Sequence, residues 1–594
     1  MASDLGYILL LLAMVLAVYS AAGSVLGARR GIPELVQSAR FACYLIVPLL
    51  LAATGLLVVL FLSHDFQVSY VFLHSNLAMK PIYTWVAFYA GNEGSLLYIA
   101  TAFSVLAALA VALAPKRLWP STPYTTAVLM LMLTFFLGVM ATLANPFARL
   151  DFIPGDGQGI NPLLTHPGMF IHPPMLMAGL VSVTIPFSFA MGHLLAGRTG
   201  DEWVDTGRAW GIVAWAILGT GNLLGAWWAY TILGWGGYWG WDAIEIVGLM
   251  PWLVLTAFIH SIMVQKRRGM FRMWNIALIN VALGLALFGM FINRGGPVPS
   301  VHSFGASKLG WIFLSFMGLS VALSFAVFFW RYGRLKSARP LESMLSRESA
   351  FLVNNFLFLF VAFVSLWGVI YPLISQAFQG VTVTVGAPFY VKVNGSVFLG
   401  IIFLMGIGPL LPWHRASWRT LGKALLIPGL SALAVAISLP LVGLQKPFAV
   451  ASFALCTLVA ASVLQEWVRG TAARHTKGEN YLLAFLWLVA ANRPRYGGYV
   501  VHLAVVALAL GVVASSSYDI QRDVVLAPGQ RVEVGDYTIE YVGWKTAEMA
   551  DRTEFSADLR LYRGESFLGT VTSWQAFYPQ FRMNSTRAAI RSTP

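Results

Sequence analysis

Long apolar runs, separated by short polar or basic segments, fill the first 516 residues of the chain. A helix of about 20 apolar residues spans the hydrocarbon core of a bilayer. We count about 14 such runs, near residues 5–27, 40–63, 92–114, 121–144, 172–196, 207–229, 245–264, 273–293, 310–330, 351–373, 396–412, 424–443, 447–465 and 499–516. The pattern predicts an all-α polytopic membrane protein.

The pattern changes after residue 516. Apolar and polar residues alternate in RVEVGDYTIEYVGW and in DLRLYRGESFLGTVTSW, and both stretches contain glycines. Alternation with a period of two is typical of β-strands, and the glycines mark turns. We therefore expect a multi-helix transmembrane domain at 1–516 and a small β-rich domain outside the membrane at 517–594.

Basic residues predict the orientation of the chain. Short loops rich in Lys and Arg stay on the cytoplasmic side of a membrane. Of the 39 Lys and Arg residues, 24 fall in the loops of one side, and before the tail the other side holds only Lys80, Arg149, Arg294, Lys308, Lys392 and Lys446. The net charge of +14 therefore reflects topology rather than nucleic-acid binding, and both chain ends are expected outside the cytoplasm. The first apolar run lacks a small-residue cleavage site, so we expect a retained helix.

Composition and cysteine usage exclude several functions. With 58% hydrophobic and 11% charged residues, the chain leaves no room for a sizeable soluble catalytic domain. Its two cysteines, Cys43 and Cys456, lie in separate apolar runs, so no disulfide framework, CxxC pair or CxxCH haem-attachment segment is present. A Gly-rich phosphate loop, a GxSxG elbow and an HExxH motif are also absent from the sequence, which argues against hydrolases and nucleotide-driven enzymes.

An aromatic segment at 227–252 reads WWAYTILGWGGYWGWDAIEIVGLMPW and holds six of the 21 tryptophans. Two interpretations fit it. Tryptophans gather at membrane surfaces as an interfacial belt, and indoles interleaved with glycines also form a flat platform for a large planar ligand. Its two charged residues, Asp242 and Glu245, either cap the following helix or touch the ligand.

Two histidines lie inside apolar runs. His260 and His502 occupy TAFIHSIMV and YVVHLAVVA, each a few residues from an inner end marked by basic residues. An imidazole at that depth is unfavourable without a partner, so each is either a hydrogen-bonded core histidine or a ligand. Because the two match in depth on separate helices, a haem with both imidazoles as axial ligands is one of the two expected arrangements.

Two further histidines lie on the outer side, with the aromatic segment. His172 opens a helix in GMFIHPPMLM, where the two prolines suit a first turn, and His302 lies on the loop NRGGPVPSVHSFG. Either these histidines make surface hydrogen bonds, or they ligate one haem iron from opposite sides while the aromatic segment holds the porphyrin plane.

Several motifs together resemble those of one family. They are DFQVSYVFLHSN at 65–76, NEGSLLY at 92–98, NPLLTHPGMFIHPP at 161–174, WGGYWGWD at 235–242, MPWL at 250–253, FIHS at 258–261, SVHSF at 300–304 and YGGYVVHL at 496–503. The aromatic segment resembles the signature of the WWD haem-handling proteins. Nearly the whole chain resembles the CcmF family, the membrane haem lyases of bacterial cytochrome c maturation.

The resemblance implies roles for particular residues. The family's two external haem-flanking histidines, its catalytic pair, correspond to His172 and His302. Its two transmembrane ligands of a b-type haem correspond to His260 and His502. The platform for the substrate haem would consist of Trp235, Trp239, Trp241 and Asp242. Arg294 would either pair with a haem propionate or snorkel to the interface.

The resemblance also implies the reaction and its partners. A lyase of this family takes haem from a haem chaperone and promotes thioether bonds to the CxxCH cysteines of apocytochrome c. No side chain looks like a nucleophile, so we expect catalysis by positioning. The resident haem b would reduce the transient substrate haem. Expected partners are the chaperone, apocytochrome c, thiol-reductant or apocytochrome-binding maturation subunits, a quinol electron donor and the lipid bilayer, with no nucleic acid. The expected location is the bacterial inner (cytoplasmic) membrane.

The chain departs from the family pattern at several positions. In the aromatic segment, Gly240, Ala243, Ile244 and Ile246 stand where the family usually has Phe, Pro, Val and Asn. No haem-binding role can therefore be given to the lost Asn. Asn92 stands where family members have a histidine, so no ligand role is carried to that position. Family chains usually have one more helix after the external domain, so we expect a last helix beyond Pro594.

Three other function classes stay open. A haem transporter would use the same histidines as a path across the bilayer. A respiratory b-type cytochrome would use His260 and His502 for electron transfer alone. An ion-antiporter-like subunit would carry Lys and Glu within its helices, and the predicted spans contain almost none.

The predicted orientation can be tested with a reporter enzyme that is active only in the cytoplasm. Fused after Tyr518, the reporter should be inactive, because the basic loops place residues 517–594 outside. The same reporter fused after Gly269, in a basic loop, should be active. Activity of the Tyr518 fusion would contradict the predicted orientation.

Overall fold

The structure, a computed structural model, describes residues 1–232, 237–298, 300, 307–337, 339–476, 478–549 and 552–591. Its chain divides into two compact units. Unit 1 comprises Met1–Ser337, Ser365–Val385 and Val524–Pro594, and unit 2 comprises Ala338–Val364 and Gly386–Asp523.

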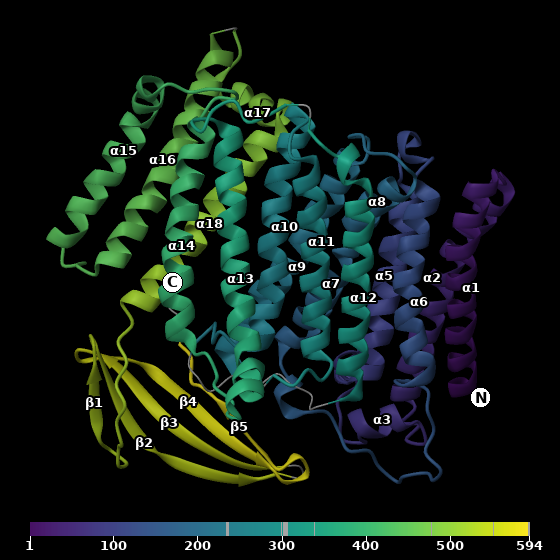
Figure 1. The fold of residues 1–594 in the computed structure, drawn as a ribbon. Helices are drawn as coiled ribbons and strands as arrows, with labels where there is room; N and C mark the ends of the chain where they lie inside the picture. Colours follow the sequence, from purple (N-terminus) through teal and green to yellow (C-terminus); the bar gives the residue numbers. More distant parts are fainter. Residues whose placement is uncertain are drawn as a thin grey trace. The chain divides into compact units, whose positions relative to one another are not determined.

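Helices make up most of both units (Figure 1). The helices of unit 1 are α1 (Ala2–Arg30), α2 (Pro33–Leu62), α3 (Ser69–His74), α4 (Thr84–Phe88), α5 (Asn92–Ala112), α6 (Thr122–Thr142), α7 (His172–Ser182), α8 (Thr184–Leu195), α9 (Val204–Ile232), α10 (Ala243–Arg268), α11 (Arg272–Asn293) and α12 (Lys308–Arg331). Helix α13 (Arg347–Gln379) contributes residues to both units. Unit 2 continues with α14 (Ala387–Ile407), α15 (Trp418–Leu441), α16 (Pro447–His475), α17 (Tyr481–Ala491) and α18 (Arg493–Ser517).

Fourteen helical segments of the described chain are long and apolar enough to cross a membrane. One of them, Pro167–Leu195, combines the short turn η4 (Pro167–Phe170) with α7 and α8. The predicted all-α polytopic class is confirmed, and each run predicted from the sequence corresponds to one of these segments.

Local sequence signals set the turns between helices, as the α1–α2 hairpin illustrates. Gly31 ends α1 in the left-handed conformation, with φ 66°, which a side chain would disfavour. Pro33 then starts α2, where a missing backbone N–H costs nothing. Small residues let the helices approach, because a Cβ atom at Gly27 would lie 2.8 Å from Val36 Cγ2.

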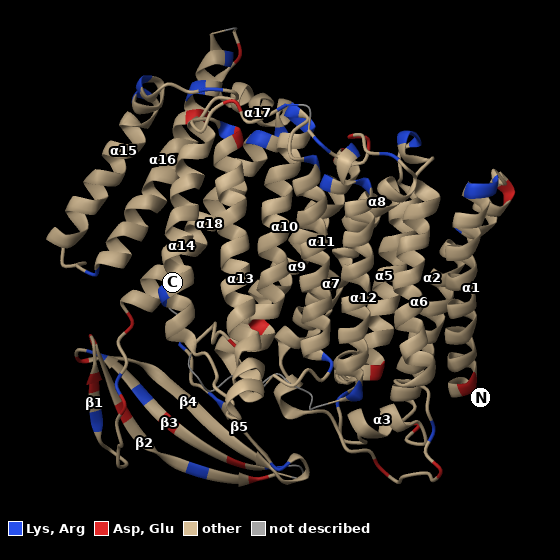
Figure 2. Ribbon diagram, viewed as in Figure 1, with Lys and Arg blue, Asp and Glu red and all other residues tan. Residues whose placement is uncertain are grey.

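Charged residues of unit 1 divide between the two ends of its helices. Lys and Arg gather at the upper end in Figure 2, where Arg29 and Arg30 end α1 and Lys266–Arg268 end α10. The β-strands lie at the opposite end (Figure 1). This is the charge asymmetry on which the predicted orientation depends.

The C-terminal strands form one antiparallel sheet in the order β1–β2–β3–β4–β5. The strands are β1 (Arg531–Val534), β2 (Tyr537–Glu548), β3 (Thr553–Arg563), β4 (Ser566–Tyr578) and β5 (Met583–Arg587). In the register, Tyr541 lies opposite Leu559 and Leu559 opposite Val571, so these apolar side chains share one face. The predicted β-rich C-terminal segment is confirmed.

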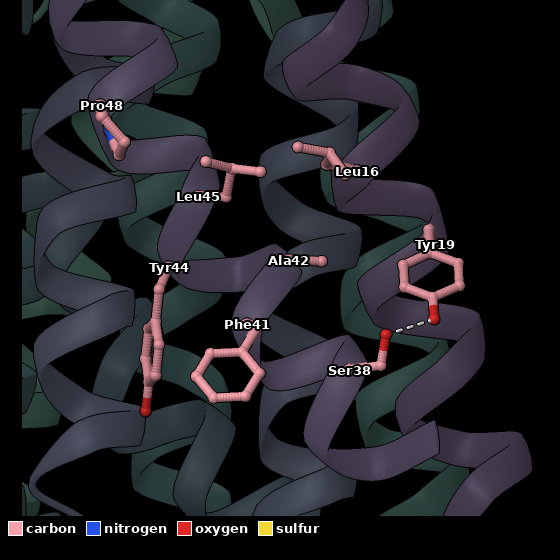
Figure 3. Close-up of a pocket in the computed structure, with 8 residues that line it drawn as sticks. All are labelled: Leu16, Tyr19, Ser38, Phe41, Ala42, Tyr44, Leu45 and Pro48. Carbon is pink, nitrogen blue, oxygen red and sulfur yellow. Dashed lines mark hydrogen bonds between the residues drawn. The ribbon is translucent and has the colours of Figure 1, made fainter. Parts of the chain in front are cut away.

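An open groove of about 600 Å³ lies between α1 and α2 (Figure 3). Apolar and aromatic side chains line it, and the hydroxyl of Tyr19 lies 2.7 Å from that of Ser38. No histidine lines this groove, so it is not the haem site that the sequence predicts.

Replacing Gly179 by Ala should destabilise unit 1. A Cβ atom there would lie 2.6 Å from the Cα atom of Leu218 in α9, and a backbone cannot move aside as a side chain can. Overpacking of this kind costs about 1–3 kcal/mol, so the purified variant should unfold at a lower temperature than the parent protein. Gly138→Ala in α6 is the control, because no neighbouring atom lies within 4 Å of its added Cβ. Equal losses in both variants would contradict the close α7–α9 packing.

Candidate functional site

His172 is the first residue of α7, and two prolines follow it in the first turn, as the sequence predicts. Its Nδ1 atom lies 2.8 Å from the carbonyl oxygen of Gly221 in α9. A carbonyl only accepts hydrogen bonds, so Nδ1 carries the proton and Nε2 carries the lone pair. This is the orientation and tautomer that a carbonyl partner gives to a metal-ligating histidine.

Helix α9 makes room for the His172 ring. A Cβ atom at Gly225 would lie 2.5 Å from His172 Cε1, so the ring occupies the space that a side chain there would take. The ring of Trp228 is nearly parallel to the imidazole, with centroids 6.3 Å apart and planes at 14°. Trp228 is only 5% exposed, so its ring is held in place beside His172 by the residues around it.

The described part of the aromatic segment forms a tight turn before α10. The rings of Trp239 and Trp241 meet edge to face, with centroids 5.9 Å apart and planes at 90°. Trp241 has φ 56°, a conformation that is uncommon for a large side chain and costs on the order of 1–3 kcal/mol. Strain of this kind persists where surrounding contacts hold it, and it is frequent at ligand sites. Trp235 lies outside the described residues.

Two carboxylates hold this turn. Glu245 accepts hydrogen bonds from the backbone N–H groups of Gly240, at 2.9 Å, and Asp242, at 3.0 Å. Asp242 in turn accepts from the backbone N–H of Ile244 at 3.1 Å, which completes a capping box at the start of α10. The capping role that the sequence allowed for both acids is confirmed, and contact of Asp242 with a ligand stays a prediction.

Asp242 also ties the aromatic segment to the loop after α11. The hydroxyl of Ser300 donates a hydrogen bond to Asp242 Oδ2 at 2.6 Å. Sequence reasoning missed this contact, although Ser300 opens the SVHSF motif. His302, two positions further along, lies outside the described residues, and its role as a haem ligand stays a prediction.

Arg294 follows α11 and is 3% exposed. Its Nη1 donates to the carbonyl oxygen of Asn92 at 3.3 Å, to the Asn92 side-chain oxygen at 3.1 Å, and to the hydroxyl of Ser95. The guanidinium is therefore buried against the start of α5 and does not extend to the surface. Its pairing with a haem propionate stays a prediction. The asparagine that replaces the family's histidine thus has a structural partner.

His260 lies in α10, and its contacts repeat those of His172. Its Nδ1 lies 2.7 Å from the carbonyl oxygen of Thr256, one turn earlier, which again leaves the lone pair on Nε2. The side chain of His260 is partly buried, and its neighbours Phe258 and Ile262 on the same helix are fully buried. His260 therefore meets the same criterion for a haem ligand as His172: a carbonyl partner fixes the orientation and the tautomer of its ring.

His502 lies in α18 of unit 2. One turn before it, Tyr499 is buried and its hydroxyl accepts a hydrogen bond from Arg495 Nε at 3.0 Å. Arg495 also pairs with Glu466 of α16. His260 belongs to unit 1 and His502 to unit 2, and their binding of one iron stays a prediction.

His166 has a different, structural role. Its Nδ1 accepts a hydrogen bond from the backbone N–H of Gly168 at 2.9 Å, and its Nε2 lies 3.1 Å from the hydroxyl of Thr231 in α9. Burial lowers the pKa of His166, and the nearby Arg587 guanidinium lowers it further. The neutral His166 ring therefore connects η4 to α9, with one nitrogen bonded to each.

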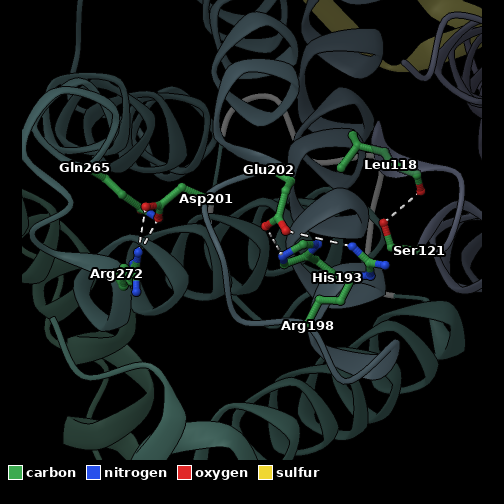
Figure 4. Close-up of polar contacts among 8 residues, drawn as sticks. All are labelled: Leu118, Ser121, His193, Arg198, Asp201, Glu202, Gln265 and Arg272. Carbon is green, nitrogen blue, oxygen red and sulfur yellow. Dashed lines mark hydrogen bonds and ion pairs between the residues drawn. The ribbon is translucent and has the colours of Figure 1, made fainter. Parts of the chain in front are cut away.

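A polar cluster lies at the basic end of unit 1 (Figure 4). Asp201 accepts hydrogen bonds from Arg272 at 2.7 Å and from Gln265 at 2.7 Å. Burial alone would raise the pKa of the Asp201 carboxyl, but these hydrogen bonds hold it below its usual value. In the same cluster, His193 Nε2 lies 3.3 Å from a carboxylate oxygen of Glu202. This histidine therefore has an acidic neighbour, whereas the Nδ1 atoms of His172 and His260 lie next to carbonyl oxygens.

Comparison with known proteins adds independent evidence. The family described as "Cytochrome C assembly protein" matches residues 89–295, and the one described as "CcmF C-terminal beta-sandwich" matches residues 517–594. The chain is 34% identical to cytochrome c-type biogenesis protein CcmF of Pseudomonas aeruginosa, over 99% of this chain and 89% of the relative. It is 32% identical to the protein of the same name of Escherichia coli, over 91% and 82%. A solved structure named "Cytochrome c Heme Lyase CcmF" matches with a TM-score of 0.81 at 29% identity, covering 100% of this chain and 90% of the other.

Replacing Gly225 by Ala should weaken haem binding on the outer side, because the added Cβ would displace the His172 ring. A misplaced ligand costs about tenfold or more in affinity, and titration of the purified protein with haem, followed by absorption, measures it. Gly318→Ala in α12, where the Cβ meets no atom within 4 Å, is the control. Equal haem affinity of the Gly225→Ala variant and the parent protein would show that the fit around His172 is unimportant.

Proposed function

Because the chain belongs to the CcmF family of cytochrome c biogenesis proteins, we propose that it is the haem lyase that attaches haem to the CxxCH segment of apocytochrome c. The single observation that carries the proposal is the fixed His172 imidazole. Its Nδ1–H is bound to the Gly221 carbonyl and its ring lies beside Trp228, so the ring direction is fixed, and in this tautomer Nε2 is the nitrogen that would bind iron.

The reaction needs positioning more than chemical activation. Each cysteine thiol adds across one vinyl group of haem. Its S–H bond and the π bond of the vinyl group break, one C–S bond and one C–H bond form, and no external oxidant or reductant is consumed. The protein contributes by holding the porphyrin in one orientation with its vinyl edge accessible. His172 and His302 would bind the iron of the substrate haem, and the platform of Trp235, Trp239, Trp241 and Asp242 would support its face.

His260 and His502 would hold a resident b-type haem. The Thr256 carbonyl orients the His260 ring, and the ring lies on a predominantly apolar helix. When bound, this haem supplies one electron at a time to keep the substrate iron reduced. A quinol in the bilayer is its proposed source of electrons.

The acceptor cysteines and their reductant come from partners. Both cysteines of the chain, Cys43 and Cys456, are free and buried in helices, so neither is available for thiol exchange. We therefore assign haem delivery to a haem chaperone and thiol reduction to other maturation subunits. Transfer would take place on the outer side of the bacterial inner membrane, the side on which the β-rich domain at 517–594 is expected.

His172→Ala should abolish the accumulation of covalent c-type cytochromes in cells while the purified variant keeps its b-type haem. The reason is that His172 opens α7 on the predicted outer side, whereas His260 lies in the second half of α10, toward its basic end. Staining of covalent haem in membranes measures the first effect, and the reduced absorption spectrum of the purified protein measures the second. Normal cytochrome maturation in the His172→Ala and His302→Ala variants would favour a transporter or a plain electron-transfer protein instead.

His260→Ala and His502→Ala should each abolish the reduced b-type spectrum, because an iron with two axial imidazoles requires both. His193→Ala and His414→Ala are controls and should keep it, since these residues contact the carboxylates of Glu202 and Glu342. A full spectrum in His260→Ala would rule out this ligand assignment.

A further inference from the structure

A stacked pair of tryptophans lies between His172 and His260 in unit 1. The rings of Trp215 in α9 and Trp252 in α10 have centroids 5.2 Å apart and planes at 23°. Trp215 stands six residues before Gly221, whose carbonyl holds His172, and Trp252 stands eight residues before His260. With a rise of about 1.5 Å per residue, Trp215 lies about 9 Å along α9 from Gly221, and Trp252 lies about 12 Å along α10 from His260.

Thr256 connects the stacked pair to His260. Its hydroxyl accepts a hydrogen bond from Trp215 Nε1 at 2.8 Å and donates one to the carbonyl oxygen of Trp252 at 2.8 Å. Its own carbonyl accepts from His260 Nδ1 at 2.7 Å. One residue therefore links the imidazole to both tryptophans through hydrogen bonds.

The packing around the pair keeps its rings in place. A Cβ atom at Gly219 would lie 2.7 Å from Trp252 Nε1, so glycine at this position admits the ring. Asn222 donates from Nδ2 to the carbonyls of Leu218, at 3.0 Å, and Gly248, at 3.2 Å, and thereby joins α9 to α10 one turn from the pair. Asn222 is the neighbour of Gly221 in the sequence. Its hydrogen bonds therefore help to position both the stacked tryptophans and the carbonyl group that binds His172.

Hydrogen bonding does not explain the position of the Trp252 ring. Its Nε1 is buried and has no hydrogen-bond partner among the described residues. A buried donor without a partner costs about 1–3 kcal/mol. The contacts that position the ring are therefore packing contacts: it stacks on Trp215 and occupies the space left by Gly219.

We propose, resting on the haem-lyase function proposed for this chain, that Trp215 and Trp252 mediate electron tunnelling from the haem at His260 to the haem at His172 and are themselves neither oxidised nor reduced. Electron tunnelling slows steeply with distance, and stacked indoles with hydrogen bonds couple better than aliphatic side chains. One electron leaves the inner iron, which goes from iron(II) to iron(III), and reduces the iron of the substrate haem from iron(III) to iron(II). A quinol oxidised to quinone releases two electrons and two protons and restores two inner irons.

The test uses the purified full chain with its inner haem, loaded with oxidised haem on the outer side. A soluble quinol reduces the inner haem, and stopped-flow absorption follows the two haems separately. Trp215→Leu with Trp252→Leu should slow reduction of the outer haem on the order of tenfold. The content of the inner haem, its midpoint potential and its rate of reduction by quinol should stay as in the parent protein. Trp252→Phe, which keeps a stacked ring, should retain part of the lost rate.

Trp311→Leu in α12 is the matched control, because this tryptophan is 63% exposed and lies far along the chain from both histidines. The rate at which the outer haem is reduced should be unchanged in this variant. An unchanged rate in the double leucine variant would overturn the relay and leave the lyase function standing. Loss of the inner haem from both the leucine and the Phe variants would mean a structural role and also overturn the relay. If no electron reaches the outer haem in the parent protein, the proposed function itself fails.

Discussion

The hydrogen bond from an imidazole Nδ1–H to a backbone carbonyl is the interaction on which the site depends. His172 makes it to Gly221 and His260 makes it to Thr256. Each bond fixes both the direction of the ring and the nitrogen that keeps a lone pair. A backbone carbonyl in a helix moves only with the helix. The His172 ring therefore depends on the packing of α7 against α9, whereas the His260 ring is held by its own helix.

Helix α9 is the element that brings these contacts together. Gly221 and Gly225 accommodate His172, and Trp215 stacks on Trp252 of α10. Small residues along α9 allow this closeness, because helices in lipid associate through close packing rather than through the hydrophobic effect. Helix α9 therefore contacts His172 directly and also packs against α10, the helix that carries His260.

Two of the positions that depart from the family pattern make hydrogen bonds that hold this chain's structure. Gly240, which replaces a phenylalanine, donates its backbone N–H to Glu245 in the strained turn at Trp241. Asn92, which replaces a histidine, accepts a hydrogen bond from the buried Arg294. At both positions the substituted residue therefore contributes to holding the outer segments, whereas the sequence comparison alone showed only what had been lost.

The sequence by itself determined the helical spans, the β-rich tail and the helix start at His172, because these depend on the pattern of neighbouring residues. It also carried the family resemblance. It left open whether Asp242 and Glu245 cap α10 or touch a ligand, and the structure showed the cap. Only the tertiary structure decided which distant groups meet: His172 with a carbonyl 49 residues away, Ser300 with Asp242, and Trp215 with Trp252. Lipid-facing and core-facing positions of a membrane helix are equally apolar, so its sequence does not reveal which neighbour each face contacts.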